Sequence, residues 1–329
     1  MEPSSDATSA WKLLVRHSIE AWKPLPLNTL LKGILEKCNS LDEFLEGQTL
    51  GFAFWFFQKR EAFLRQDAMT KWSRDRLDDY VLLPAANGYV SRATCFFVSH
   101  FWHSKDDPDP EGKYLRLHQE SLGPQSWDYI WVDWTCTPQS PRTPAEDIYF
   151  ASTLQTMSAI IRNAGFAWFY PPFEPRLWIL YEVAEYALTC DHGVDPFPDI
   201  KKYREHVEEM LNNGVRTTLE KHRYRSTYES DKEFLVSWLE LLMLTKNLRL
   251  DTMDIRRLFD NLTWHRLAGD LICNTTRGTL QLYRFEGVLE LNGERHTFTP
   301  FPNWVFGNGK LTLESKRSHD KTFTTVNLY

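Results

Sequence analysis

Three short apolar runs, Cys95–Ser99, Tyr129–Asp133 and Phe166–Phe169, lie within the stretch from Thr94 to Cys190. Turn or cap residues bound each run, and segments with a helical pattern separate them. Strands that are joined by helical crossovers pair in parallel and are buried on both faces. The stretch therefore predicts an α/β fold built on a short parallel sheet that is covered by helices.

The regions on either side of this core have different patterns, which divide the chain into four segments. Apolar stripes at helical spacing come first, and we expect one long helix over residues 49–72. Alternating apolar residues with a hairpin signal at Asn292-Gly293 come last. The predicted segments are 1–90, an N-terminal helical layer; 91–195, the α/β core; 196–275, a helical region; and 276–329, a C-terminal β-meander.

Composition excludes several classes of protein. The 5 cysteines are scattered and show no CxxC pair, which argues against a disulfide framework and a zinc motif, so we expect no metal or cofactor. Every apolar run is shorter than the roughly 18 residues of a membrane span, which predicts a cytoplasmic protein without membrane contact. The net charge of −6 argues against general nucleic-acid binding, although a local basic patch remains compatible with it.

Polar residues follow the predicted strands at the edge where open α/β sheets bind ligands. Ser99 and His100 end the first strand, and Asp133 ends the second with Cys136 just beyond. Ser99 and Cys136 are candidate nucleophiles and His100 and His103 candidate bases, while Cys136 equally suits a small core position. No nucleophile elbow, Walker loop or Rossmann glycine pattern is present, which excludes a standard hydrolase, kinase or dehydrogenase.

The loop after the first strand is the densest acidic cluster of the chain. It contains Asp106, Asp107, Asp109 and Glu111, with Pro108 and Pro110 among them. A hydrated surface loop is one interpretation, and its spacing does not match a calcium-binding loop. The other interpretation is capture of a guanidinium group, because carboxylates bind it through paired hydrogen bonds. Arg142 is a candidate for contact with phosphate.

The core stretch resembles a divergent TIR-type domain. The shared features are a first strand that ends in Ser-His, a second that ends in Asp, and a helix with Trp178 and Glu182 in a Trp-x-x-x-Glu pattern. The resemblance implies a TIR-like or Rossmann-like three-layer core with Glu182 as the catalytic carboxylate. Trp178 stands one helical turn before Glu182, where burial beside an indole raises a carboxylate pKa.

The full-length pattern is similar to a fungal orphan family that includes the arginine-containing cyclodipeptide synthases. This resemblance implies a cytoplasmic transferase of secondary metabolism that joins two aminoacyl groups, from arginyl-tRNA and a second aminoacyl-tRNA, into a diketopiperazine. Glu182 would then transfer protons, and the acidic loop would bind arginine. The other side chains expected to contact substrate are Trp102, His103, Trp134, Arg142 and Trp178. Two alternatives remain open: a TIR-like N-glycosidase that uses Glu182 on NAD or a nucleotide, and a non-enzymatic assembly module.

Overall fold

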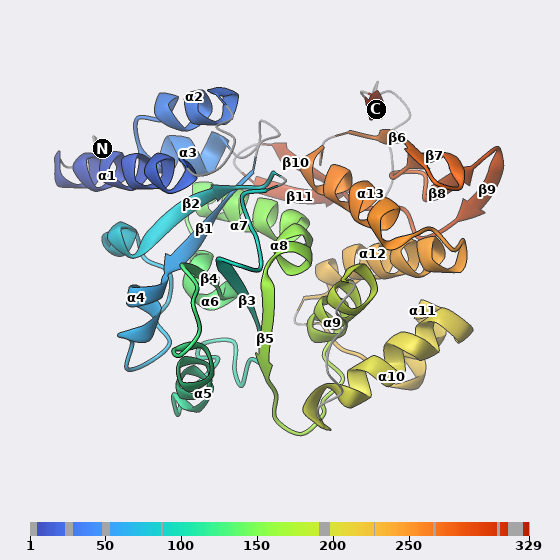
Figure 1. The fold of residues 1–329 in the computed structure, drawn as a ribbon, viewed down its shortest axis with the longest axis horizontal. Helices are drawn as coiled ribbons and strands as arrows, with labels where there is room; N and C mark the ends of the chain where they lie inside the picture. The colour runs from blue at the N-terminus through green and yellow to red at the C-terminus, as the bar shows by residue number, and fades with distance from the viewer. Residues whose placement is uncertain are drawn as a thin grey trace. The chain divides into compact units, whose positions relative to one another are not determined.

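The computed structural model describes residues 5–23, 29–47, 53–86, 88–190, 198–226, 228–265, 268–307, 310–314 and 325–328. Figure 1 shows the fold, which divides into two compact units, Met1–Phe169 and Tyr170–Tyr329. The fold is a mixed α/β fold, as the sequence predicts. Of the helices described, none combines the length and the apolar character that a membrane crossing requires.

The first unit holds a sheet with helices on both faces (Figure 1). Its elements in chain order are α1 (Ser5–Trp22), α2 (Thr29–Lys37), α3 (Leu41–Gly47), β1 (Phe54–Lys59), α4 (Arg60–Leu64), the 3₁₀ helix η2 (Arg74–Asp79), β2 (Tyr80–Pro84), β3 (Cys95–His100), α5 (Lys113–Leu122), β4 (Tyr129–Trp131), α6 (Asp133–Cys136), α7 (Pro144–Thr156), α8 (Ser158–Asn163) and β5 (Gly165–Phe169).

The sheet of the first unit is mixed rather than purely parallel. Within the described residues its strand order is β2-β1-β4-β3-β5. The predicted parallel pairing is confirmed, because β3 pairs in parallel with both β4 and β5. Strand β1, however, pairs antiparallel with β4 and with β2, and the sequence pattern indicated neither β1 nor β2. The parallel part of the sheet therefore has an antiparallel extension at one side.

The long helix expected over residues 49–72 is wrong. Residues 49–52 lie outside the described residues, and the rest forms strand β1, the short helix α4 and a segment that leads into η2. Both faces of β1 are buried, from Phe54 to Phe57, so its apolar residues run without a break. A continuous apolar run carries no period of two, and it is indistinguishable from a buried helix by pattern alone.

Aromatic and aliphatic side chains fill the space between the sheet and its two helical layers. On one face, Phe44 of α3 and Tyr149 of α7 contact Phe56 of β1, with ring centroids 5.9 and 5.3 Å apart. On the other face, Leu115 of α5 belongs to a core cluster with Val98 of β3. This second layer matters for the site, because α5 brings its side chains to the end of β3.

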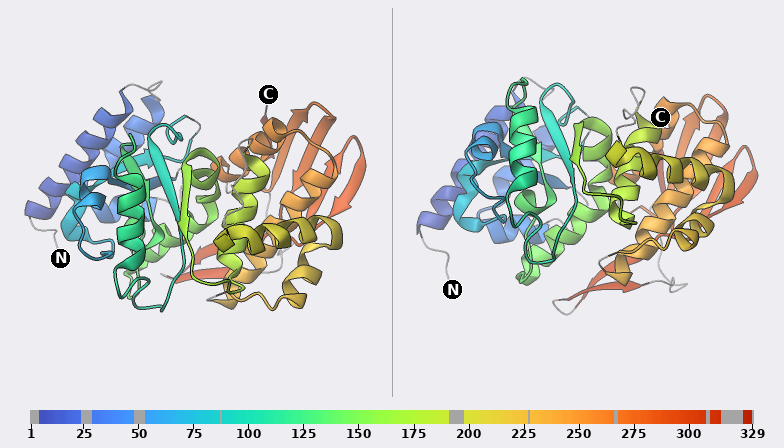
Figure 2. Two further views of the ribbon diagram at one scale, coloured as in Figure 1. Left: turned by 60° about the horizontal axis from the view of Figure 1, so that its bottom comes forward. Right: turned by 90° about the horizontal axis from the view of Figure 1, so that it is seen from below.

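The second unit combines helices with a separate, mostly antiparallel sheet (Figure 2). The sheet's order among the described strands is β12-β6-β7-β8-β9. Strands β7, β8 and β9 form the first part of the predicted meander, whereas β6 was not predicted and β12 joins it in parallel. Strands β10 and β11 form their own hairpin. The elements are α9 (Leu177–Thr189), α10 (Pro198–Asn213), α11 (Val215–Lys221), α12 (Glu229–Asn247), α13 (Thr252–Trp264), β6 (Asp270–Thr275), β7 (Gly278–Tyr283), β8 (Val288–Leu291), β9 (Glu294–Thr297), β10 (Asn303–Gly307), β11 (Lys310–Glu314) and β12 (Thr325–Leu328).

Candidate functional site

The carboxyl ends of the three parallel strands meet at one edge of the sheet in the first unit. His100, the last residue of β3, is paired in register with Phe169, the last residue of β5. Strand β4 ends at Trp131, two residues earlier than predicted, and Asp133 begins the one-turn helix α6. The residues that follow β3 and β4 therefore lie at the edge where the sequence places a ligand site.

Asp133 is held between two tryptophans at this edge. Its Oδ2 accepts a hydrogen bond from Trp102 Nε1 at 2.8 Å, and its Oδ1 accepts one from the Trp134 backbone N–H at 2.6 Å. The two indole rings meet edge to face, with centroids 5.1 Å apart. Asp133, Trp102 and Trp134 were each predicted as site residues, and the structure brings these three together.

The environment of Asp133 shifts its titration toward neutral pH. Burial disfavours the charged carboxylate and raises its pKa from 3.8 to about 6, against the lowering effect of the Trp134 and Trp102 N–H donors. The side chain is half-buried. A carboxyl group with a pKa near the working pH is suited to general acid–base catalysis, because both protonation states are populated.

Two buried histidines lie beside this edge, one of them not predicted. His100 and His118 of α5 are 7% and 1% exposed, and none of their ring nitrogens has a hydrogen-bond partner within the described part of the chain. Burial lowers the pKa of His100 to about 4 and that of His118 to about 3. Both imidazoles are therefore neutral at pH 7.

The surroundings of His100 include both aromatic and acidic side chains. The nearby carboxylate of Asp109 acts against the lowered pKa of His100, whereas His103 acts with the burial. His103 itself is exposed and packs on the ring of Tyr114, with centroids 5.3 Å apart. The structure thus gathers His100, His103 and Asp109 from the predicted site residues, with Tyr114 and His118 added by α5.

The acidic loop uses part of its charge for its own folding. Asp109 is 4% exposed, and its Oδ2 accepts the backbone N–H of Leu115 in the first turn of α5 at 2.8 Å. Asp107 is exposed, and its Oδ1 accepts the N–H of Asp109 at 3.0 Å. Glu111 is exposed as well. The carboxylates that face solvent, and that could receive a cation, are therefore those of Asp107 and Glu111 together with the exposed Asp106.

The two candidate nucleophiles are interior residues. Ser99 and Cys136 are both 0% exposed. Burial raises the pKa of the Cys136 thiol to about 11, and its sulfur lies 3.6 Å from the carbonyl oxygen of Ile130. A thiol with this pKa is protonated at neutral pH and is a weak nucleophile. As placed here, Ser99 and Cys136 present no nucleophile at the surface of the edge.

Arg142 is engaged within the first unit. Its Nε donates to Asp147 Oδ1 at 2.7 Å, and its guanidinium lies 3.9 Å above the ring centroid of Phe150. The side chain is 18% exposed, so a phosphate would have to compete with Asp147 for it. The predicted contact of Arg142 with phosphate stays a prediction.

Trp178 and Glu182 belong to the second unit, in helix α9. The indole of Trp178 donates to Asp231 Oδ2 at 3.1 Å and meets Tyr181 edge to face. Glu182, one turn later, is 9% exposed. A carboxyl group with so little contact with solvent fits the expected desolvation, and its catalytic role stays a prediction.

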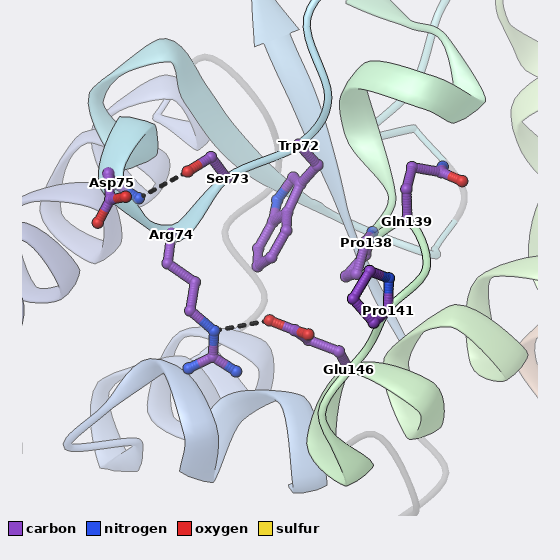
Figure 3. Close-up of a pocket in the computed structure, with 8 residues that line it drawn as sticks. All are labelled: Trp72, Ser73, Arg74, Asp75, Pro138, Gln139, Pro141 and Glu146. Atoms are coloured by element: carbon purple, nitrogen blue, oxygen red, sulfur yellow. Dashed lines mark hydrogen bonds and ion pairs between the residues drawn. The ribbon is translucent and has the colours of Figure 1, made fainter. Parts of the chain in front are cut away.

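A polar pocket that the sequence did not indicate lies in the first unit beside the chain that follows β4 (Figure 3). The backbone N–H of Trp72 donates to the Trp134 carbonyl at 3.1 Å, and the Gln139 side chain donates to the Asp133 carbonyl at 3.0 Å. The pocket, of about 280 Å³, therefore borders the backbone of the Asp133 segment. Its lining residues are Trp72, Ser73, Arg74, Asp75, Pro138, Gln139, Pro141 and Glu146.

The main cation of this pocket is already neutralised. Arg74 donates to Glu146 Oε1 at 2.6 Å, to Asp42 Oδ1 at 2.7 Å and to Thr143 Oγ1 at 3.2 Å. Figure 3 shows the ion pair between Arg74 and Glu146 across the pocket from Pro138 and Gln139. Through Asp42 and Glu146 the guanidinium connects α3 with α7. Because each of its nitrogens already donates a hydrogen bond, it has few donors left for an anionic ligand.

Comparison of the chain with protein-family models, with curated proteins and with solved structures gives no match. Function is therefore inferred from the residues of the chain alone.

Proposed function

We propose that the chain is an enzyme that transfers protons at the strand edge of its first unit, with Asp133 as the acid–base group. One observation carries the proposal: a half-buried carboxyl with a pKa of about 6 is fixed by hydrogen bonds from Trp102 and Trp134. Such a group accepts a proton from substrate above pH 6 and returns it to a leaving group. The partly exposed indole of Trp102 offers a flat surface to a planar substrate group, whereas the indole of Trp134 is buried in the core.

For the reaction we propose aminoacyl transfer that yields an arginine-containing cyclic dipeptide. The amino group of one aminoacyl-tRNA attacks the ester carbonyl of the other, an amide bond forms, and the ester bond to the tRNA ribose oxygen breaks. A second attack closes the ring and releases the second tRNA. In each step the amine loses a proton and the ribose oxygen gains one. A free α-amino group has a pKa of about 7.7–8.0, which is close enough to the pKa of Asp133, about 6, for a proton to pass between the two groups.

The acidic loop supports arginine as one of the two amino acids. Asp107 and Glu111 present exposed carboxylates beside the strand edge. Two carboxylate oxygens match the paired N–H groups of a guanidinium, and lysine lacks that planar arrangement. Asp109 belongs to the same acidic cluster, but its carboxylate binds the backbone N–H of Leu115 at the start of α5, so it supports the conformation of the loop and does not contact arginine in this proposal.

Expression in bacteria tests this proposal, because the cells supply every aminoacyl-tRNA and NAD. Mass spectrometry of extracts should detect a new arginine-containing diketopiperazine with the wild-type chain, and its loss with Asp133→Asn. Asp128→Asn, which alters an exposed aspartate just before β4, is the matched control and should retain the product. Absence of any such product from soluble, folded wild-type protein would contradict the proposed reaction.

A second candidate function rests on Glu182. A nearly buried carboxylate one helical turn after Trp178 has the character needed to stabilise the ribosyl cation of an N-glycosidase. In this case the same extracts should show depleted NAD with the wild type and with Asp133→Asn, and normal NAD with Glu182→Gln. The pair of variants therefore separates the two reactions.

A further inference from the structure

Two histidines and a glutamate converge in the second unit. His206 and Glu209 lie three residues apart on α10 and so share one face of the helix, and His222 follows the end of α11. One nitrogen or carboxylate oxygen from each residue lies within 4.8 Å of the other two. In the part of the chain that the structure describes, this is the single cluster of three potential metal ligands.

His206 has a nitrogen that is buried and not used. The residue is 2% exposed, and its Nε2 has no hydrogen-bond partner among the described residues. Its Nδ1 lies 2.8 Å from the hydroxyl of Tyr224, which fixes the orientation of the ring. Leaving a buried polar atom without a partner costs free energy, and a metal ion would remove that cost.

The other two ligands are already in contact and can be reached from solvent. Glu209 Oε2 lies 2.8 Å from His222 Nε2, and the two side chains are 17% and 22% exposed. The rings of His206 and His222 are stacked with centroids 3.6 Å apart.

We propose that His206, Glu209 and His222 bind a divalent transition-metal ion, with Zn²⁺ as the best match. Two imidazoles and one carboxylate are a common ligand set for zinc, which leaves a fourth position for water. Zinc bonds of about 2.0–2.1 Å place tetrahedral ligand atoms roughly 3.3 Å apart. Glu209 Oε2 and His222 Nε2, which lie 2.8 Å apart, must move apart slightly to reach that spacing, and no two of the three ligand atoms are more than 4.8 Å apart.

Two neighbours adjust the strength of the site. Tyr224 holds His206 in place through Nδ1, the type of outer contact that orients metal-binding histidines. Lys221 Nζ binds the other oxygen of Glu209, Oε1, at 2.8 Å. Because this ammonium repels a metal ion, replacing it should strengthen metal binding. Misfolding of the variant would weaken binding, so it would not explain an increase in affinity.

The ion would connect α10 to the segment that holds the beginning of α9. Downstream of His222, the N–H of Arg225 donates to the Pro175 carbonyl and the Arg225 carbonyl accepts the N–H of Leu177, both at 2.9 Å. Helix α9 carries Trp178 and Glu182. Metal binding therefore fixes the segment that supports this helix, whichever reaction the chain catalyses.

The test is Zn²⁺ binding by full-length, untagged protein after chelator treatment, in a Cys38→Ser background because Cys38 is a half-buried thiol. Competition with a fluorescent chelator should give one ion per chain. Glu209→Gln and His222→Gln should weaken binding at least about 100-fold and Tyr224→Phe about tenfold. Lys221→Gln should bind more tightly. X-ray absorption at the zinc edge should show two imidazole ligands.

His296→Gln is the matched control, since His296 lies 3.8 Å from Glu294 as a histidine–glutamate pair that belongs to no cluster of three. It should bind zinc as the wild type does. Amide hydrogen exchange of residues 221–226 should slow when zinc is added to the wild type and not to Glu209→Gln. Equal affinity of wild type and Glu209→Gln, or zinc binding that only His296→Gln weakens, would overturn the proposal.

Discussion

The buried histidine His118 makes a quantitative prediction about stability and pH. Its imidazole has a pKa of about 3 in the fold, against 6.5 as an ordinary value, because burial disfavours the charged form. The unfolded chain therefore binds a proton below pH 6.5 that the folded chain does not bind. The free energy of unfolding is unaffected by His118 above pH 6.5 and decreases as the pH falls below that value. At pH 5, 1.5 units below 6.5, the loss is about 2 kcal/mol at 1.36 kcal/mol per unit.

Replacing His118 by leucine isolates this term. Leucine has a similar volume, and His118 donates and accepts no hydrogen bond within the described residues, so we expect a change of less than about 1.5 kcal/mol at pH 8. At pH 5 the variant should gain about 2 kcal/mol relative to the wild type. His100 and Asp133 also titrate in this range, with opposite effects on stability, but they contribute to both proteins and cancel in the comparison.

The assay is urea unfolding at pH 8, 7, 6 and 5, monitored by the hydrogen exchange of peptides from Lys113–Leu122. These peptides lie in the first unit, so the transition that they report is the unfolding of that unit. Leu115→Ala is the control, because it damages the same helix without a titratable group. Its cost, about 2–5 kcal/mol, should be equal at pH 8 and pH 5. A His118→Leu effect that is also independent of pH would refute the reasoning.

Individual side chains give further measurable effects. Trp102→Phe removes an N–H donor from the Asp133 carboxylate, so the pKa of Asp133 should rise further, and any activity that needs the ionised form should begin at higher pH. Thr143→Ala removes the N-terminal cap of α7 and should cost about 1 kcal/mol in urea unfolding, whereas Thr143→Ser should not. Iodoacetamide at pH 8 should modify the half-buried Cys38 and leave Cys136 intact until urea is added; equal labelling would contradict the buried position of Cys136.

The parallel core was predictable because its residues carry local signals. The runs that became β3, β4 and β5 are bounded by turns, and Thr143 with Glu146 forms the capping box that its spacing indicates. Ser40 and Glu43 have the same spacing but form only half of such a box: the Ser40 hydroxyl accepts the Glu43 N–H, but the Glu43 carboxylate accepts the N–H of Asn39. Strand β1 was missed because it is buried on both faces, so its sequence lacks the alternation of apolar and polar residues that marks a half-buried strand.

The site was predictable in its location and only partly in its members. Strand ends point to the edge that holds His100 and Asp133, but a contact such as Trp102–Asp133 joins residues 31 apart and depends on the tertiary fold. His118 had a usable signal, since it follows Tyr114 by four residues on the apolar face of a predicted helix. The cluster of His206, Glu209 and His222 had none, because 13 residues and a helix end separate its last two members.

The most direct test of the account is the titration of the Asp133 carboxyl. Protein labelled with ¹³C at the aspartate carboxyl carbons gives one signal per aspartate, and the spectrum of Asp133→Asn identifies the signal of Asp133 by its absence. The Asp133 signal should titrate with a midpoint near pH 6, and that midpoint should shift upward in Trp102→Phe. A midpoint near 3.8, the ordinary value for aspartate, would contradict the assignment of Asp133 as the acid–base group.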